Sequence, residues 1–93
     1  MLTVVVYDIS ENTSRNNLIK RLQYFGLKRI QKSVFIGYLE LKERLDLVDD
    51  LDTFLSKESD SIIIFPLCEN CKKSILLVGD AEIPENDLTY RFL

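Results

Sequence analysis

The chain has 93 residues, a hydrophobic fraction of 46% and a net charge of −3, which indicate one globular domain over residues 1–93 and exclude a disordered chain. No stretch approaches the length of a membrane span, and no basic region typical of a signal peptide begins the chain, so the expected location is the cytoplasm, away from membranes. There is no histidine, which excludes imidazole general bases and histidine-ligated zinc.

The hydrophobic pattern predicts four strands and two helices, which we assign to the order β-α-β-β-α-β. The strands are expected at about residues 2–7, 31–39, 61–65 and 74–79, and the helices at about 13–25 and 43–56. The first helix is expected to stop at Gly26, and the second carries an apolar stripe at helical spacing. This order is that of the ferredoxin-like α+β fold, in which both helices cover one face of an antiparallel sheet.

Two of the expected strands are apolar at successive positions, residues 4–6 and 62–64, and both are expected in the centre of the sheet. Successive side chains point to opposite faces, so the face without helices is apolar as well. A second copy of the sheet is the simplest cover for it, and a homodimer is therefore expected. The tail, residues 80–93, ends in a possible fifth short strand at 88–93, which is expected to dock on the dimer partner.

A carboxylate, Asp8, directly follows the first apolar strand. An ionised carboxylate at the mouth of a buried strand needs a partner or a metal ion. The alternative is a turn, since Asp is a common turn residue and the next residues, Ser10, Glu11 and Asn12, also form turns. This segment taken alone favours the turn.

Cys68 and Cys71, the only cysteines, form a Cys-x-x-Cys motif. Two thiolates are half of a structural zinc site, and the chain has no second ligand pair. A redox motif of this kind normally opens a helix, whereas this one stands between two expected strands. It is therefore predicted to form a hairpin turn.

The charges are distributed unevenly along the chain. Between residues 12 and 39 there is no acid, and the bases there are Arg15, Lys20, Arg21, Lys28, Arg29 and Lys32. Between residues 40 and 69 the acids outnumber the bases. The asymmetry suggests either a basic face that binds nucleic acid or a helix face that is basic only because it is solvated.

Several motifs stand in a recognisable order, namely Val6-Tyr7-Asp8-Ile9, Arg15, Tyr24-Phe25-Gly26, the run of residues 29–35 and Phe65-Pro66-Leu67-Cys68. In this order they resemble the small CRISPR-associated adaptation protein, the dimeric partner of the CRISPR integrase. That family has been described as metal-dependent endoribonucleases or endonucleases.

The resemblance implies a homodimer in which two copies of Asp8 lie near the axis and share one Mg²⁺ ion. Mg²⁺ prefers oxygen ligands and keeps several waters, so one or two carboxylates suffice. The implied catalytic candidates are Asp8, Tyr7, Arg15, Arg29 and Phe35. The candidates for binding nucleic acid are Arg15, Asn17, Lys20, Arg21, Lys28 and Arg29. Asn17 stands where family members often carry a basic residue, and its amide can hydrogen-bond a phosphate without neutralising it.

The expected function is that of a Mg²⁺-dependent nuclease acting on RNA or DNA in CRISPR spacer acquisition, together with the integrase. An adaptor that holds duplex DNA for the integrase, with Asp8 idle in catalysis, fits the same residues. The sequence does not separate RNA from DNA as the substrate. A third class, an RNA-binding module of the RRM type, shares the strand order, but its basic-Gly-aromatic-Gly-aromatic signature is absent from residues 61–65.

Overall fold

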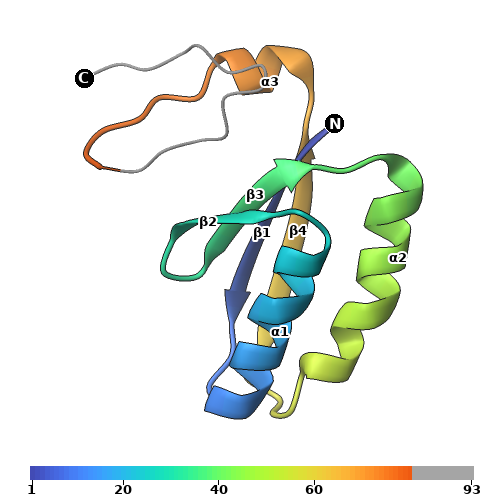
Figure 1. Ribbon diagram of the computed structural model, residues 1–93. Coiled ribbons are helices and arrows are strands. Elements are labelled where there is room, and N and C mark those ends of the chain that lie inside the picture. The colour runs from blue at the N-terminus through green and yellow to red at the C-terminus, as the bar shows by residue number, and fades with distance from the viewer. Residues whose placement is uncertain (81–93) are drawn as a thin grey trace.

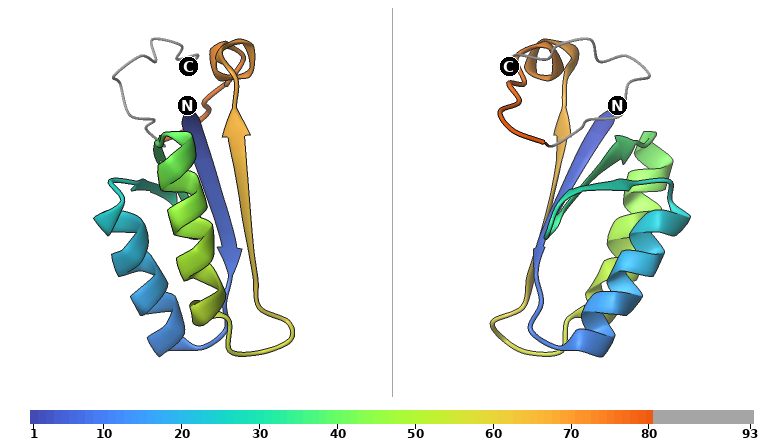
Figure 2. Two further views of the ribbon diagram at one scale, coloured as in Figure 1. Left: turned by 90° about the vertical axis from the view of Figure 1, so that its right-hand side faces the viewer. Right: turned by 60° about the vertical axis from the view of Figure 1, so that its left-hand side comes forward.

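The computed structural model describes residues 1–80, so the expected fifth strand at 88–93 and nearly all of the tail lie outside the described residues. Within them, an antiparallel sheet has the order β2-β3-β1-β4, and its strands are β1 (Leu2–Asp8), β2 (Lys28–Gln31), β3 (Val34–Tyr38) and β4 (Ser61–Leu67). The helices α1 (Asn12–Tyr24) and α2 (Leu41–Leu51) cover one face of this sheet (Figure 1 and Figure 2). The ferredoxin-like fold is confirmed. No helix of residues 1–80 is long and apolar enough to cross a membrane.

Three of the predicted strands differ from the structure. The strand expected at 31–39 is a hairpin, in which β2 and β3 pair with Arg29 opposite Phe35 and Gln31 opposite Val34. β3 therefore lies in the centre beside β1, and residues 62–64, expected in the centre, lie in the edge strand β4. Within residues 74–80, no strand forms where one was expected. Taken in chain order, the expected ranges would give β-α-β-α-β-β, which is wrong. The assigned order β-α-β-β-α-β is correct because the hairpin supplies two strands and residues 74–80 supply none.

The core between the sheet and the helices consists of apolar residues that recur in the sequence at the spacing of a helix or a strand. Its buried members include Val5, Tyr7 and Phe35 from the sheet, Leu18 and Leu22 from α1, and Leu47 and Leu51 from α2. The first helix stops at Gly26, as predicted. The φ angle of Gly26 is 86°, in the left-handed region that glycine adopts without strain. The short 3-10 helix η1 (Asp52–Phe54) continues α2 towards β4.

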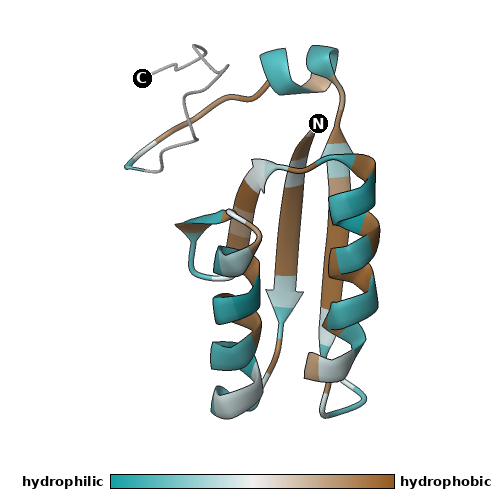
Figure 3. Ribbon diagram, turned by 45° about the vertical axis from the view of Figure 1, so that its right-hand side comes forward, coloured by the Kyte–Doolittle hydropathy of each residue, from teal (hydrophilic) through white to brown (hydrophobic). Residues whose placement is uncertain are grey.

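The opposite face of the sheet is apolar as well, because β1 and β4 are hydrophobic at successive positions, which Figure 3 colours brown. Val4 and Ile36 are buried there, with Ile75 of the same chain packed against their cluster. Residues that were expected to form a strand thus cover part of this face instead. On the same face, Ile63 and Phe65 of β4 stand opposite Val6 and Val4 and remain exposed, by 56% and 40%.

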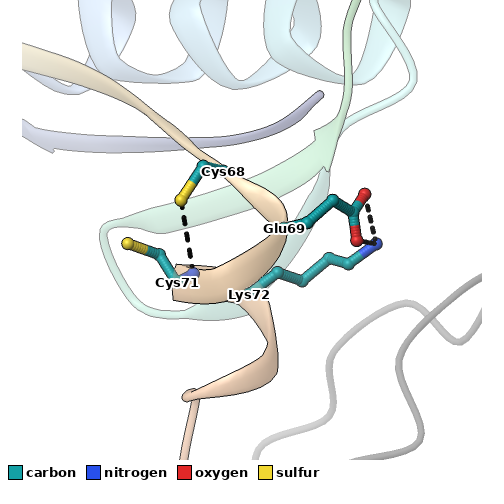
Figure 4. A network of polar contacts seen from close by, with 4 residues as sticks. All are labelled: Cys68, Glu69, Cys71 and Lys72. Carbon is teal, nitrogen blue, oxygen red and sulfur yellow. Dashed lines mark hydrogen bonds and ion pairs between the residues drawn. The ribbon is translucent and has the colours of Figure 1, made fainter.

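The Cys-x-x-Cys motif opens a helix, and the predicted hairpin turn is wrong. α3 (Glu69–Lys73) begins after Cys68, whose sulfur accepts a hydrogen bond from the backbone N–H of Cys71 at 3.4 Å (Figure 4). The Lys72 side chain is buried, with its ammonium 3.1 Å from the Glu69 carboxylate and 5.3 Å from the ring centroid of Tyr38. The thiol cap and the anchorage of Lys72 on β3 stabilise a helical turn where a hairpin would need a following strand.

Candidate functional site

Asp8 is the last residue of β1, and its side chain is exposed. The residues on either side of it, Tyr7 and Ile9, are 3% and 4% exposed. The side chain that directly follows Asp8, that of Ile9, is therefore buried in the core again. β1 thus presents Asp8 at its end, beside Ser61 of the edge strand β4.

Arg15 is fixed against the loop that follows Asp8. One guanidinium nitrogen, Nη1, donates a hydrogen bond to the carbonyl oxygen of Ile9 at 3.0 Å, and the other, Nη2, contacts the side-chain oxygen of Asn12. Arg15 lies in the first turn of α1, so the helix start and the Asp8 loop are joined through this side chain. The guanidinium has five N–H donors, and these two contacts with described residues use two of them.

Arg29 reaches the same region from β2. Its Nη2 donates to the hydroxyl of Tyr7 at 3.4 Å, and its guanidinium lies 5.4 Å from the ring centroid of Phe35. The Tyr7 hydroxyl in turn donates to the carbonyl oxygen of Lys32 at 3.1 Å. Because Tyr7 and Phe35 are buried, the structure gives these two candidates the role of holding Arg29 in place.

These side chains border a hollow of about 440 Å³ at the end of β1. It is lined by Asp8, Ile9, Arg15, Asn16, Ile19, Arg29, Lys32 and Ser33. Asp8, Arg15 and Arg29 were all predicted from the sequence, and they meet here although they come from β1, α1 and β2. Asn16 and Ser33 were not predicted, because single small polar residues give no signal of their own in a sequence.

The other predicted nucleic-acid ligands lie elsewhere. Asn17, Lys20 and Arg21 line a second hollow of about 380 Å³, together with the exposed Tyr24 and with Phe54. Arg21 lies 3.8 Å from a carboxylate oxygen of Asp50 and 5.4 Å from the ring centroid of Tyr24, so part of its charge is already offset. Lys28 is exposed on β2 and lines neither of these two hollows.

Asp60 supports the Asp8 loop and was missed by the sequence analysis. Its carboxylate accepts hydrogen bonds from the backbone N–H and the hydroxyl of Ser10, both at 3.2 Å. It also accepts from the backbone N–H and hydroxyl of Ser56 and from the backbone N–H of Lys57, at 3.0 to 3.1 Å. The backbone N–H of Ser56 is the largest cause that lowers the pKa of Asp60, which falls from 3.8 to about 2 although burial raises it.

The donor set of the hollow fits a hydrated Mg²⁺ ion. Within residues 1–80, no three His, Cys, Asp or Glu side chains come together to hold a metal ion, and the hollow contains one carboxylate, that of Asp8. Mg²⁺ takes one or two carboxylates and completes its shell with water or phosphate oxygens. Among the described residues, Asp8 is therefore the one whose carboxylate would hold the ion in this hollow.

The family model of CRISPR associated protein Cas2 matches residues 1–75 of the chain. The chain belongs to the Cas2 family. This confirms the resemblance of the motifs and removes the RRM-type alternative.

Relatives of this Cas2 chain carry the name CRISPR-associated endoribonuclease. The protein from Archaeoglobus fulgidus is 39% identical over 83 residues, which are 89% of this chain and 88% of the relative. The protein from Korarchaeum cryptofilum is 37% identical over 76 residues, which are 82% of each chain.

Solved structures show the same fold. A hypothetical protein from Thermus thermophilus matches this Cas2 chain with a TM-score of 0.77 and 31% identity, over 90% of this chain and 96% of that one. The crystal structure of Streptococcus pyogenes Cas2 matches with a TM-score of 0.68 and 24% identity, over 85% of this chain and all of that one. The second likeness supports the fold alone.

Proposed function

We propose that this Cas2 chain hydrolyses phosphodiester bonds of RNA or DNA as a homodimer in CRISPR adaptation. The names of its relatives support a nuclease, since those proteins are called endoribonucleases. The observation that carries the proposal is that Asp8 shares one hollow with Arg15 and Arg29. A carboxylate that can hold Mg²⁺, beside two guanidinium groups that can hold phosphate, suffices for phosphodiester hydrolysis without histidine.

Arg15 and Arg29 would bind the phosphate. Both guanidinium groups donate a hydrogen bond to the protein, Arg15 to the Ile9 carbonyl and Arg29 to the Tyr7 hydroxyl. Because these bonds already restrict the two side chains, little side-chain freedom is lost when a ligand binds. Their planar forks match the oxygens of a phosphate and offset the negative charge that grows on them during the reaction.

The reaction consumes one water and changes no oxidation state. The water oxygen bonds to phosphorus, the bond from phosphorus to the leaving oxygen breaks, and the proton lost by the water balances the one gained by the leaving oxygen. Mg²⁺ bound at Asp8 would supply a Lewis acid and a more acidic water. Asp8 serves this role in its ionised form, as a ligand.

A homodimer is part of the proposal for two reasons. Within residues 1–80, one chain contributes a single carboxylate to the hollow, and a second copy of Asp8 would give the shared Mg²⁺ ion the two carboxylates that it commonly takes. In addition, Ile63 and Phe65 leave apolar surface exposed on the sheet face without helices, and a second copy would cover it.

A second candidate function is an adaptor that holds duplex DNA for the CRISPR integrase. The hollow formed by Asn17, Lys20, Arg21, Tyr24 and Phe54 favours it, because this basic part of α1 is separate from Asp8 and contains no carboxylate in its lining. Such a surface can contact the phosphate backbone without cutting it. The two functions therefore differ in their need for Asp8.

The experiment is a cleavage assay on single-stranded RNA and on duplex DNA, with and without Mg²⁺. Wild type is compared with Asp8→Asn and with Asp49→Asn, a control that removes an exposed carboxylate of α2. Cleavage is expected to need Mg²⁺ and to fall by at least about 100-fold in Asp8→Asn, since a neutral amide is a poorer ligand for Mg²⁺. Equal cleavage by Asp8→Asn and wild type would refute the nuclease. Binding of duplex DNA and integrase without any cleavage would establish the adaptor.

A further inference from the structure

The thiol groups of Cys68 and Cys71 have no role in the proposed function, yet the structure brings them together. The backbone N–H of Cys71 donates a hydrogen bond to the Cys68 sulfur at 3.4 Å, and the two thiols are also hydrogen-bonded to each other. Both sulfurs lie on the same side of the first turn of α3 (Figure 4), and both side chains are exposed. Two thiols in this arrangement can react with a small molecule and then with each other.

The local backbone fits a disulfide bond between these two residues. Cys68 has an extended backbone, with φ of −70° and ψ of 171°, and directly precedes the first residue of α3. The turn is fixed by the backbone N–H of Lys72, which donates to the carbonyl oxygen of Cys68 at 2.8 Å. Residues three apart in such a turn have Cβ atoms about 5–6 Å apart, and a disulfide needs about 3.5–4.5 Å. Closing the bond therefore requires a small adjustment and leaves the direction of the chain unchanged.

A metal site is the other use of a Cys-x-x-Cys motif. Structural zinc takes four ligands, and among the residues that the structure describes no third His, Cys, Asp or Glu joins the two thiols. A redox motif was set aside in the sequence because it normally opens a helix, and the structure shows that this motif does open one. The chemistry that the described residues support is therefore thiol–disulfide exchange.

We propose that Cys68 and Cys71 form a redox-modification site, at which exchange with a low-molecular-weight disulfide such as glutathione disulfide closes a reversible Cys68–Cys71 bond. This bond fixes the α3 turn and the segment that follows it. Disulfides between exposed cysteines are readily reduced again, as a reversible modification requires. The inference concerns a site that neither the nuclease nor the adaptor function uses.

The exchange takes place in two balanced steps. The Cys68 thiol loses its proton to water, its sulfur bonds to one sulfur of the small disulfide, and the other sulfur leaves as a thiolate with the bonding electron pair. The Cys71 thiolate then bonds to the Cys68 sulfur and expels the second small thiolate. Two protein thiols are oxidised by two electrons, the small disulfide is reduced to two thiols, and the two protons reach these products through water.

The order of the two steps follows from the hydrogen bonds. The backbone N–H of Cys71 is the largest cause that lowers the pKa of Cys68, so Cys68 supplies the first thiolate. The hydrogen bond with the Cys68 sulfur, and then the charge of that sulfur, raise the pKa of Cys71. A Cys68 sulfur that is bound in a mixed disulfide carries no charge, so the second cause disappears when Cys71 has to ionise.

The α3 turn connects β4 to a segment that lies on the sheet face without helices. The buried side chain of Lys72 contacts the ring of Tyr38 in β3, and Ile75 and Leu77 pack against the apolar cluster of that face. In the reduced form the Cys68 sulfur holds the turn only as a weak hydrogen-bond acceptor. A covalent bond restricts the opened turn much more, so oxidation is expected to keep this segment more firmly on the sheet.

This site is distant from Asp8. Cys68 follows Leu67, which pairs with Leu2 at the start of β1, whereas Asp8 ends that strand. Seven residues of strand span about 20 Å. The inference can therefore be tested without reference to cleavage.

The first experiment incubates the full-length chain with mixtures of glutathione and glutathione disulfide in EDTA, followed by acid quenching and mass spectrometry of the intact chain and its peptides. Wild type is expected to lose two hydrogen atoms and to form the Cys68–Cys71 bond, which dithiothreitol reverses. Mixed disulfides should remain below about a tenth of the product, because the second thiol already lies beside the first.

Two variants separate the steps of the reaction. Cys71→Ser keeps the backbone N–H that activates Cys68 but lacks the second thiol, so it should stop at a mixed disulfide on Cys68. Asp8→Asn should form the Cys68–Cys71 bond as wild type does, which separates this site from the proposed nuclease. Circular dichroism of the reduced variants should match wild type.

The second experiment measures amide hydrogen exchange by NMR in the reduced and oxidised forms of wild type. The N–H groups of Ser74 and Ile75 donate to the carbonyl oxygens of Cys71 and Lys72 at 3.0 and 3.3 Å, so they report opening of the turn. Their exchange is expected to be at least about fivefold slower in the oxidised form. The amide of Leu22 in α1 is the control and should exchange equally in both forms.

Two results would overturn the inference. The first is wild type that yields only mixed disulfides, or disulfides between copies of the chain, at every ratio of glutathione to its disulfide. The second is equal exchange of Ser74 and Ile75 in the reduced and oxidised forms, which would show that the bond does not fix the turn. Neither result depends on Mg²⁺ or on cleavage, so failure here and failure of the proposed function are distinguishable.

Discussion

The carboxylate of Asp60 accepts two hydrogen bonds from Ser10, one from its backbone N–H and one from its hydroxyl, each at 3.2 Å. Ser10 lies two residues after Asp8, and Asp60 lies directly before β4. The other oxygen of Asp60 accepts from Ser56 and Lys57 in the loop before β4. One carboxylate thus joins the two loops beside Asp8, and the direction of the Asp8 loop depends on a residue 50 positions away.

Asp60→Asn is expected to destabilise the fold at neutral pH, because one of the two carboxylate oxygens becomes an N–H₂ group that cannot accept hydrogen bonds. The pKa of Asp60 is lowered from 3.8 to about 2, so its stabilising effect is complete above about pH 4 and is lost as the pH falls towards about 2. Urea unfolding at several pH values should show wild type losing more stability than Asp60→Asn between about pH 4 and pH 2. Asp49→Asn is the exposed control. Parallel pH curves for wild type and Asp60→Asn would contradict this role of Asp60.

The two thiols of the Cys-x-x-Cys motif are expected to react at different rates. The backbone N–H of Cys71 lowers the pKa of Cys68, and a hydrogen bond with the Cys68 sulfur raises the pKa of Cys71. Both side chains are exposed, and thiolates are the reactive form. Iodoacetamide at about pH 7.5, below the usual cysteine pKa, should therefore label Cys68 several-fold faster, as peptide mass spectrometry can follow.

Two variants check the cause of this difference. Cys71→Ser keeps the backbone N–H that lowers the pKa of Cys68, so Cys68 should stay reactive. Cys68→Ser removes the sulfur that raises the pKa of Cys71, so labelling of Cys71 should become faster. Equal labelling of both cysteines in wild type would show that the thiol cap of α3 does not form in solution.

The sequence predicts those elements whose signal is local. α1 and α2 are marked by buried leucines one turn apart, Leu18 with Leu22 and Leu47 with Leu51, and β1 by its run of valines. β2 was missed because it is an edge strand of mostly polar, exposed residues that exists through its pairing with β3. The segment at 74–79 has the composition of a strand, yet Ile75 and Leu77 pack on the sheet face instead.

The candidate site also contains residues that the sequence predicts and residues that it does not. Asp8 is visible in the sequence because a carboxylate ends an apolar strand, and the family motifs add Arg15 and Arg29. The contacts of Arg29 with Tyr7 and Phe35 could not be predicted from the sequence, because they require β2, β3 and β1 to be neighbours in the sheet. Asp60 has no local signal either, since its partner Ser10 is distant in the chain.

Arg29→Ala is expected to weaken binding of duplex DNA and to reduce the dependence of binding on salt. Each phosphate neutralised contributes about −0.9 to the slope of log K against log salt concentration, so losing one contact should reduce the magnitude of the slope by about one. Arg21→Ala should matter less, because Arg21 already lies 3.8 Å from Asp50. Fluorescence anisotropy at several salt concentrations measures both, with Lys42→Ala on α2 as the control. A slope unchanged in Arg29→Ala would remove Arg29 from the phosphate contacts.

The exposed apolar residues of β4 are expected to lie in the dimer interface. Ile63→Ser combined with Phe65→Ser should shift the mass measured by light scattering at micromolar concentration from dimer towards monomer, because buried apolar area drives association. Leu41→Ser is the matched control, since Leu41 is also exposed and apolar but lies on α2. A wild-type chain that is folded and monomeric, or a double variant that remains fully dimeric, would contradict this interface.

Dimerisation should also respond to Mg²⁺ through Asp8, if two copies of Asp8 share one ion. Without metal the two carboxylates repel, so Asp8→Asn is expected to dimerise more tightly than wild type in EDTA. Saturating Mg²⁺ should tighten the wild-type dimer about tenfold, or about 1.4 kcal/mol, because the ion binds the dimer better than the monomer, and it should leave Asp8→Asn nearly unchanged. Sedimentation equilibrium in EDTA and in Mg²⁺ measures both constants, and Asp46→Asn, which removes an exposed carboxylate of α2, controls for net charge. A wild-type dimer that is insensitive to Mg²⁺ and no weaker than that of Asp8→Asn would show that the two carboxylates do not meet, and each Asp8 would then act within its own hollow.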